Sequence, residues 1–377
     1  MVVAWVGKQA CVAGCIFALA VLQRLAVGVG SYSGAGRAPL YGDYEAQRHW
    51  MEITLHTPLA DWYRDTPSND LRYWGLDYPP LSAYQSWAYG RAIQAFDPAA
   101  VALQTSRGFE SAFSKALMRW SSVLSDILVL FPAVAACAHV FYLRRPTAQL
   151  LVLAVGLLQP AFVLIDHGHF QYNSISLGLS AGAAAAIAAD WYCMGSMLFC
   201  LALNHKQMAA YYAPAFFAHL LGALSAATLS IKAGTHACEA GNARCWPHLL
   251  GCGAPFLVHE GAAGAALSRL APLKRGLFED YVANFWCATS MLIKWKRLLS
   301  LPVQVRLCTA ATLAAAAPSM LHQVLRPSPR GLLLCMANSA FAFFLFSFQV
   351  HEKSILLPLL PITLLAPQLL GTALGLK

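Results

Sequence analysis

Long apolar runs separated by short polar segments make up most of this chain. Several runs approach the ~20 apolar residues that a helix needs to cross a bilayer. We predict spans at roughly 9–30, 119–143, 147–166, 172–190, 195–226, 249–268, 302–324, 331–349 and 354–376, with a break inside 195–226. The pattern therefore predicts an all-α polytopic membrane protein with a single transmembrane domain over residues 1–377.

The composition agrees with this prediction. The chain is 58% hydrophobic and 11% charged, whereas a soluble domain carries roughly 25% charged residues. The formal net charge of +9 suits cytoplasmic loops and anionic lipid headgroups. The sequence contains no nucleic-acid-binding motif and no Gly-rich phosphate loop. We therefore expect membrane lipid as a partner and no nucleic acid.

Three basic clusters mark the ends of predicted spans, at 144–146, 294–297 and 326–330. The positive-inside rule places such clusters in the cytoplasm. With a cytoplasmic N-terminus carrying Lys8, the first span delivers residues 31–118 to the opposite side. This loop is the longest polar segment of the chain, so we expect it to carry the chemistry.

The loop contains GDYEAQRHWMEIT, residues 42–54, where ionisable side chains are concentrated. We predict a helix with Asp43 as its N-cap, because aspartate is a favoured capping residue. Four ionisable residues then share one face, at i, i+4, i+7 and i+11: Glu45, His49, Glu52 and His56. We interpret this segment as an amphipathic helix lying in the membrane interface.

Other interpretations of this helix stay open. Its charges could serve only to solvate an interfacial helix, and Asp43 could be a cap, a catalytic base or both. A metal site built from His49, Glu52 and His56 is disfavoured, because their spacing is not that of HExxH.

A second acid, Asp77, lies in YWGLDYPPLSAY, where Trp74 and Tyr78 accompany it. The two prolines after Tyr78 favour an extended segment. Aromatic rings beside a fixed carboxylate suit carbohydrate binding, while an interfacial aromatic belt is the alternative. Composition alone does not separate the two.

Four further stretches place ionisable groups at or near membrane depth, where they are costly and usually functional. They are LIDHGHFQYNS with Asp166, His167, His169 and Gln171, LNHKQMA with His205 and Lys206, KRGLFED with Arg275, and FSFQVHEKSILLPLLP with His351 and Lys353. Cations beside carboxylates and aromatic residues suggest a site that binds both a lipid phosphate and a sugar. A lipid or solute transporter is the alternative, but we find no inverted repeat.

Together, GDYEAQRHWMEIT, YWGLDYPPLSAY, IDHGHFQYNS, HKQMA, RGLFEDYVANFWC and FSFQVHEKSILLPLLP resemble the endoplasmic-reticulum dolichyl-phosphate-glucose α-1,3-glucosyltransferases. The resemblance implies a GT-C type glycosyltransferase in the endoplasmic reticulum membrane, with its active site facing the lumen. It implies dolichyl-phosphate glucose as donor, the dolichol-pyrophosphate-linked high-mannose oligosaccharide as acceptor, and an inverting single displacement. We favour the branch that adds the first glucose. The second-glucose branch, a non-catalytic truncated member and a lipid transporter remain the alternatives.

The resemblance also implies roles for individual residues. The family's general base maps onto Asp43, and its second acid maps onto Asp77, which we assign to acceptor binding or active-site geometry. From charge and position we infer that His351 and Lys353 hold the donor phosphate, with His205, Lys206 and Arg275 behind them. The other substrate-binding candidates are Glu45, Arg48, His49, Trp74, Tyr78, Asp166, His167, His169 and Gln171. We expect no metal and no cofactor.

Two features depart from the family pattern. Family members carry further spans after the His351-Glu352-Lys353 motif, whereas this sequence ends at Lys377, so we expect truncated C-terminal spans. The polar insert with Cys238, Cys245 and Cys252 is atypical and could hold a lumenal disulfide. A zinc site there is disfavoured, because no CxxC pair occurs.

Overall fold

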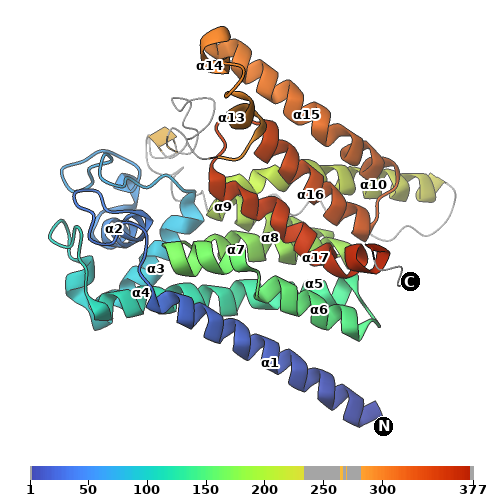
Figure 1. Ribbon diagram of the computed structural model, residues 1–377, viewed down its shortest axis with the longest axis horizontal. Coiled ribbons are helices and arrows are strands. Elements are labelled where there is room, and N and C mark those ends of the chain that lie inside the picture. Colours follow the sequence, from blue (N-terminus) through green and yellow to red (C-terminus); the bar gives the residue numbers. More distant parts are fainter. Residues whose placement is uncertain (1, 233–263, 266–268, 270–281, 374–377) are drawn as a thin grey trace.

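The computed structural model describes residues 2–232, 264–265, 269 and 282–373 (Figure 1). Within these residues every regular element is a helix, apart from one isolated bridge between Thr66 and Asn69. In order, the elements are α1 (Val2–Val29), α2 (Asp43–His56), η1 (Leu59–Asp61), α3 (Pro80–Phe96), η2 (Pro98–Val101), α4 (Ala112–Ser125), η3 (Asp126–Leu130), α5 (Phe131–Phe141), α6 (Pro146–Leu157), α7 (Pro160–Val163), η4 (Leu164–Phe170), α8 (Asn173–Ala188), α9 (Tyr192–His205), η5 (Gln207–Tyr212), α10 (Ala213–Lys232), α13 (Phe285–Thr289), α14 (Trp295–Leu298), α15 (Leu301–Leu325), α16 (Pro329–Phe346), η7 (Glu352–Ile355) and α17 (Leu356–Ala373).

Five helical segments of the described chain are long and apolar enough to cross a membrane: Lys8–Val29, Ala112–Phe141, Pro146–Phe170, Pro329–Phe346 and Glu352–Gly371. This confirms the predicted all-α polytopic architecture. Two of these segments contain π-helical stretches, η3 and η4. Such stretches are rare and frequently occur at functional sites, and η4 lies directly beside the candidate site described below. The predicted span at 249–268 falls almost entirely outside the described residues.

The core of the bundle is built from small side chains. Helix α8 buries Ala181, Ala183, Ala184 and Ala185 against its neighbours, and small residues let helix backbones approach closely in membranes. A Cβ placed on Gly178 would lie 2.9 Å from the backbone of Leu130. Glycine is therefore required where α8 crosses η3.

The break predicted inside 195–226 is confirmed, because α9 ends at His205 and α10 begins at Ala213, but the two parts do not form one span. Helix α9 runs toward the end of the bundle where Lys206 bonds Asn173 at the start of α8. Helix α10 then runs away from that end, since Gly222 packs against the Gln323 and Val324 carbonyls near the end of α15. The segment is two helices of opposite direction joined through η5, and polar Lys206 lies at the turn.

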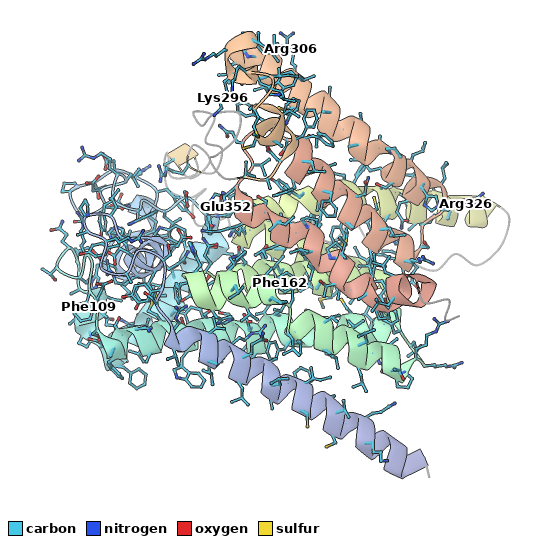
Figure 2. The ribbon with its side chains drawn as sticks, viewed as in Figure 1. Phe109, Phe162, Lys296, Arg306, Arg326 and Glu352 are labelled. Atoms are coloured by element: carbon cyan, nitrogen blue, oxygen red, sulfur yellow. The ribbon has the colours of Figure 1, made fainter. Side chains whose placement is uncertain are left out.

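The positive-inside argument predicted that the three basic clusters lie at one end of the bundle. The structure contradicts this prediction. Trp295 packs with Trp286 and Phe348, at the end where α16 finishes, whereas Arg326 follows the opposite end of α15. Figure 2 shows Lys296 and Arg326 at opposite ends of α15. The prediction failed because α15 and α16 form a helical hairpin, so the residues before α15 return to the end where α16 stops.

The loop after α1 folds into a compact unit around α2 and α3. Ser111 caps α4 by accepting a hydrogen bond from the Ser114 amide, and Pro80 occupies the first turn of α3. Helix α2 is buried from Tyr44 to Thr54. It is therefore not an amphipathic helix exposed at an interface: its apolar side packs on Trp62, Tyr63 and Leu76, and loops cover its charged side.

Candidate active site

A cavity of about 580 Å³ opens at the end of the bundle where the α2 loop meets η4, η5 and the segment before α17. Its lining residues come from parts of the chain that are far apart in sequence: Asp43, Ala46, Gln47, Trp50, Trp74, Gly75, Asp77, Tyr78, Gln171, Lys206, Gln207, Met208, Tyr211, Arg269, Phe348, Gln349, His351, Lys353 and Ser354. Five of the six predicted motifs therefore contribute residues to this cavity.

Asp43 begins α2, and its carboxylate is the centre of the polar network. Its Oδ2 accepts hydrogen bonds from His169 Nε2 at 2.8 Å, from Gln171 Nε2 at 2.6 Å and from Lys353 Nζ. Among the described residues, none donates to Oδ1, and 22% of the side chain stays exposed. One oxygen is held by the protein, and the other is left for a ligand.

The predicted N-cap role of Asp43 was wrong. Helix α2 starts at Asp43, and Gly42 occupies the N-cap position without a capping side chain. The carboxylate instead reaches across to η4 and to Lys353. Charge-assisted hydrogen bonds to fixed partners outweigh the ~1 kcal/mol that a cap contributes.

The partners of Asp43 also set its protonation. Burial would raise the pKa of its carboxyl, but the hydrogen bond from His169 and the ammonium of Lys353 outweigh burial and hold the pKa below its ordinary value. The group is therefore a carboxylate at neutral pH. Moving the Lys353 ammonium away from Asp43 would raise this pKa and strengthen the carboxylate as a base.

A second layer of amides orients the ligands of Asp43. Gln171 Oε1 accepts from Asn173 Nδ2 at 3.0 Å and from Lys206 Nζ at 3.2 Å, which turns its NH₂ group toward Asp43. Asn173 in turn donates to Asp166 Oδ1 at 2.6 Å, and the Ser174 amide donates to Asp166 Oδ2 at 2.7 Å. Asp166 thus fixes the start of α8 from behind the cavity.

Lys206 and His351 add positive or polarisable groups to the cavity wall. The Lys206 ammonium is buried and lies 4.7 Å from the centre of the Tyr78 ring. His351 Nδ1 accepts from the Lys353 amide at 3.1 Å and lies 3.4 Å from Glu352 Oε2. Together with Lys353, these groups give one side of the cavity a cationic character.

The segment with Trp74, Asp77 and Tyr78 forms another part of the cavity wall. Trp50 Nε1 on α2 donates to the Trp74 carbonyl at 2.8 Å, and Gln207 Nε2 donates to the Asp77 carbonyl at 3.2 Å. These bonds hold the aromatic segment between α2 and η5. The cavity wall therefore combines aromatic rings and an acid with cations, and the Lys206 ammonium lies over the Tyr78 ring.

Several predicted site residues do not line the cavity. Glu45, Arg48 and His49 are buried in a network on the other side of α2: Arg48 bonds Glu45 and Glu52 at 2.7 and 2.8 Å, and His49 bonds Glu52 at 3.0 Å. His56 contacts the Val101 carbonyl. The stripe supports the α2 loop, and the described residues hold no group of three His, Cys, Asp or Glu side chains arranged for a metal.

Asp166, His167 and His205 also lie behind the cavity wall. The His205 ring bonds Gln85 Oε1 at 3.0 Å, so it does not face a donor phosphate beside Lys353. Arg275 and the three cysteines Cys238, Cys245 and Cys252 lie outside the described residues.

Sequence reasoning missed two sets of residues. Arg269 lines the cavity and donates to the Gly75 and Leu76 carbonyls at 2.9 and 3.3 Å. Inside the bundle, Arg24 pairs with Asp126, and His167 bonds the same carboxylate at 3.0 Å. The sequence did contain a signal for this pair: a single arginine and a single aspartate occur in two apolar spans, and charged residues of opposite sign inside a membrane usually pair with each other.

Comparisons with a family model and with individual known proteins all point to one family of glycosyltransferases. The model of the ALG6, ALG8 glycosyltransferase family matches residues 17–373. A protein of Arabidopsis thaliana named probable dolichyl pyrophosphate Man9GlcNAc2 alpha-1,3-glucosyltransferase is 50% identical over 363 residues, which cover 94% of this chain and 67% of that protein. Proteins with the same name, without the qualifier, are 44% identical in Gallus gallus (92% of this chain, 68% of that protein) and 43% identical in Saccharomyces cerevisiae (93% and 64%).

Proposed function

The chain belongs to the ALG6, ALG8 glycosyltransferase family, and on this basis we propose that it transfers the first glucose to the dolichol-pyrophosphate-linked Man9GlcNAc2 oligosaccharide. The donor is dolichyl-phosphate glucose, and the glucose is added in α-1,3 linkage to a terminal mannose. The protein is a multi-pass helical glycosyltransferase of the GT-C type. It works in the endoplasmic reticulum membrane with the Asp43 cavity facing the lumen.

The observation that carries the proposal is the meeting of Asp43 and Lys353, which are 310 residues apart. A single displacement at an anomeric carbon needs one base for the incoming hydroxyl and positive charge for the leaving phosphate. The cavity holds a carboxylate with one oxygen open, beside Lys353, His351 and Lys206. Both requirements are met within one cavity.

In the proposed step, Oδ1 of Asp43 accepts the proton of the mannose 3-hydroxyl as its oxygen bonds to C1 of glucose. The bond between C1 and the phosphate oxygen breaks, and its electron pair leaves with dolichyl phosphate. The configuration at C1 inverts from β to α. A general base contributes about 10²–10⁴-fold to such a step.

Lys353 has two roles in this scheme. It contacts Asp43 in the structure, and a donor phosphate beside it would draw the ammonium away from the carboxylate. The pKa of Asp43 would then rise toward its ordinary value, because one of the charges that lower it is shared. Donor binding would thereby strengthen the base that the acceptor meets.

Trp74, Asp77 and Tyr78 bind the acceptor in this proposal. They form part of the wall of the cavity that the cations also line, so aromatic rings can stack on the mannose ring while Asp77 accepts a hydroxyl hydrogen bond. Glu45, Arg48 and His49 support the loop that presents this wall, and Asp166 and His169 orient the base.

The test uses the full chain reconstituted in lipid vesicles with dolichyl-phosphate glucose and lipid-linked Man9GlcNAc2. Mass analysis of the oligosaccharides should show one added hexose. Addition only to an acceptor that already carries one glucose would move the assignment to the second-glucose step. Folded protein that gives no product with either acceptor would contradict the enzymatic proposal, and movement of the donor across the vesicle without product would indicate a transporter.

A further inference from the structure

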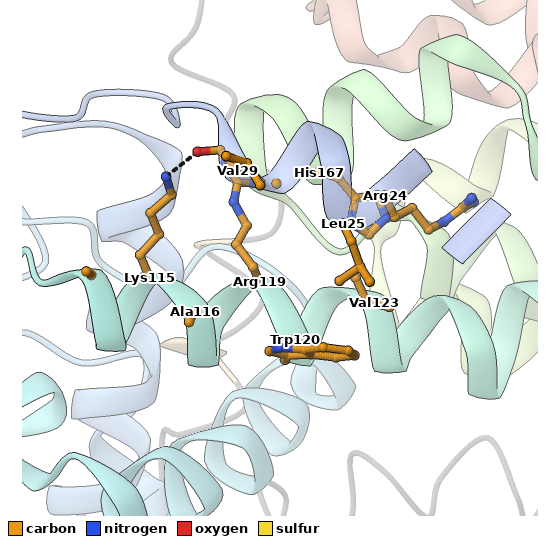
Figure 3. Close-up of a pocket in the computed structure, with 11 residues that line it drawn as sticks. Arg24, Leu25, Val29, Lys115, Ala116, Arg119, Trp120, Val123 and His167 are labelled. Atoms are coloured by element: carbon orange, nitrogen blue, oxygen red, sulfur yellow. Dashed lines mark hydrogen bonds between the residues drawn. The ribbon is translucent and has the colours of Figure 1, made fainter. Parts of the chain in front are cut away.

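A second cavity of about 350 Å³ lies between the last turns of α1 and the first turns of α4, apart from the Asp43 cavity. Figure 3 shows Lys115, Arg119 and Trp120 projecting from α4 near Leu25 and Val29 of α1. The two cavities share no lining residue. The η4 segment separates them, since its His167 lines this cavity while its His169 bonds Asp43.

The polar end of this cavity has positive charge without a matching acid. Lys115 Nζ donates to the Val29 carbonyl at 2.8 Å, and Arg119 Nη2 donates to the Ser31 and Gly168 carbonyls at 3.0 and 3.1 Å. No carboxylate in the described part of the chain pairs with either residue. Both cations therefore have only neutral partners.

Arg119 is the more unusual of the two cations. Arg119 is only 6% exposed. Its Nε and Nη1 atoms are buried, yet they have no hydrogen-bond partner among the described residues. A buried guanidinium with unpaired donors is costly. An anion in the cavity would give this guanidinium the counter-charge that it lacks, and Arg binds phosphate through charge-assisted hydrogen bonds.

The rest of the cavity is apolar and borders the surface that faces lipid. Trp120 is 54% exposed and Val29 is 79% exposed, and Leu25 and Val123 continue the apolar lining into the bundle. Val29 ends one membrane-spanning helix, and Lys115 lies in the first turn of the next. The cations therefore lie at headgroup depth, with apolar side chains extending toward the bilayer interior.

We propose that this cavity binds the phosphate headgroup of an anionic membrane phospholipid. Lys115 and Arg119 hold the phosphate oxygens, and one acyl chain lies along Leu25 and Trp120. A bilayer phospholipid fits better than the isoprenoid phosphate of the donor, because η4 separates this cavity from Asp43. Arg119 also bonds the Gly168 carbonyl within η4, so the bound lipid stabilises the segment that orients the base.

The test is lipid retention by the full chain in nanodiscs of phosphatidylcholine with or without phosphatidylinositol, released into mild detergent and measured by native mass spectrometry. We expect one retained phosphatidylinositol. Lys115→Gln should weaken its binding about tenfold, as expected for the loss of one charge-assisted contact. Lys294→Gln is the matched control, because Lys294 also donates to a backbone carbonyl, that of Ser290, at an exposed position; it should not change retention.

A second variant tests whether the lipid occupies the cavity, without changing the charge of its lining. Ala116→Leu adds volume to the cavity lining without removing a cation, and it should also reduce retention. Equal retention of phosphatidylcholine, equal loss in Lys294→Gln, or unchanged binding in Lys115→Gln and Ala116→Leu would overturn the proposal. Displacement of phosphatidylinositol by dolichyl phosphate, competing through Lys115, would overturn the choice of occupant.

Discussion

Helix α2 carries two sets of ionisable side chains whose partners come from different distances along the chain. Glu45, Arg48 and Glu52 bond one another within one or two helical turns and are completely or nearly buried. Asp43 bonds His169 and Lys353, which are 126 and 310 residues away, and borders a cavity. The first set fixes the loop, whereas the second brings distant segments together around an open oxygen.

The comparison shows that clustered charge is not by itself evidence of a site. The Glu45 carboxylate is fully used by protein donors: Arg48, the Tyr73 hydroxyl at 2.8 Å and the Gly108 amide at 3.1 Å. Asp43 keeps an oxygen that none of the described residues uses. Unused hydrogen-bonding capacity beside a cavity, not charge density, distinguishes the chemical end of α2 from its structural side.

The largest effect should come from breaking the structural set. Arg48→Met leaves Glu45 and Glu52 as buried carboxylates without their cation, and breaking a buried pair in this way costs about 3–5 kcal/mol. We expect most of the folded protein to be lost, measured as the yield of monodisperse protein and its thermal unfolding in detergent. Arg72→Met is the control, because the Arg72 side chain is 90% exposed in its pair with Asp70. Equal stability of the two variants would refute the structural role of the Arg48 network.

The next effect should come from the cation shared with the site. Lys353→Met removes positive charge beside Asp43, but His169 and Gln171 still hold the carboxylate. We expect an intact fold and a transfer rate at limiting donor that falls about 10–100-fold, since charge-assisted contacts to phosphate are lost. Lys294→Met, an exposed lysine outside the cavity, serves as control. Wild-type donor dependence in Lys353→Met would remove Lys353 from the phosphate site.

A smaller effect concerns pH and sharpens the same contrast. Burial alone would raise the pKa of Glu52, but the hydrogen bond from His49 and the charge of Arg48 lower it to about 2. A carboxyl with a depressed pKa stabilises the fold above its ordinary pKa, and that stabilisation is lost as the pH falls toward the folded value. The melting temperature should therefore drop as the pH falls from about 5 to about 2.

Glu52→Gln should make this melting temperature less dependent on pH. Asp70→Asn, which changes an acid in a surface pair, should alter the dependence less. The measurement is thermal unfolding of the three proteins across that pH range. If Glu52→Gln retains the full wild-type pH dependence, the network does not stabilise the loop through this carboxylate.

The sequence predicted the helical fold and the residues of the site better than their arrangement. Hydrophobic runs located the five described segments that are long and apolar enough to cross a membrane. The motifs supplied Asp43, Gln171, Lys206 and Lys353, all of which the structure brings to one cavity. Local patterns report which residues are unusual for their surroundings, such as a lysine between two apolar helices. They do not report which of those residues meet.

The wrong predictions share one physical cause: each depended on contacts between segments that are far apart in the sequence. A helical pattern placed Glu45 and His49 on a shared face, but it could not show that residues 100–108 cover that face. The cluster at 294–297 was placed at the wrong end, because a hairpin of two helices reverses the side on which a segment lies. Arg269 was missed because its partners are the backbone carbonyls of Gly75 and Leu76, which have no sequence signature.

The central claim is that Asp43 accepts the proton of the acceptor hydroxyl, and the rate of glucosyl transfer by Asp43→Asn tests it most directly. The substitution keeps the shape of the side chain and removes the base. With saturating dolichyl-phosphate glucose and lipid-linked Man9GlcNAc2, we predict a rate at least ~10²-fold below wild type, in protein that is still folded and monodisperse. Asp97→Asn, on the same loop at the end of α3, should transfer at the wild-type rate. Folded Asp43→Asn protein with near-normal transfer would contradict the account.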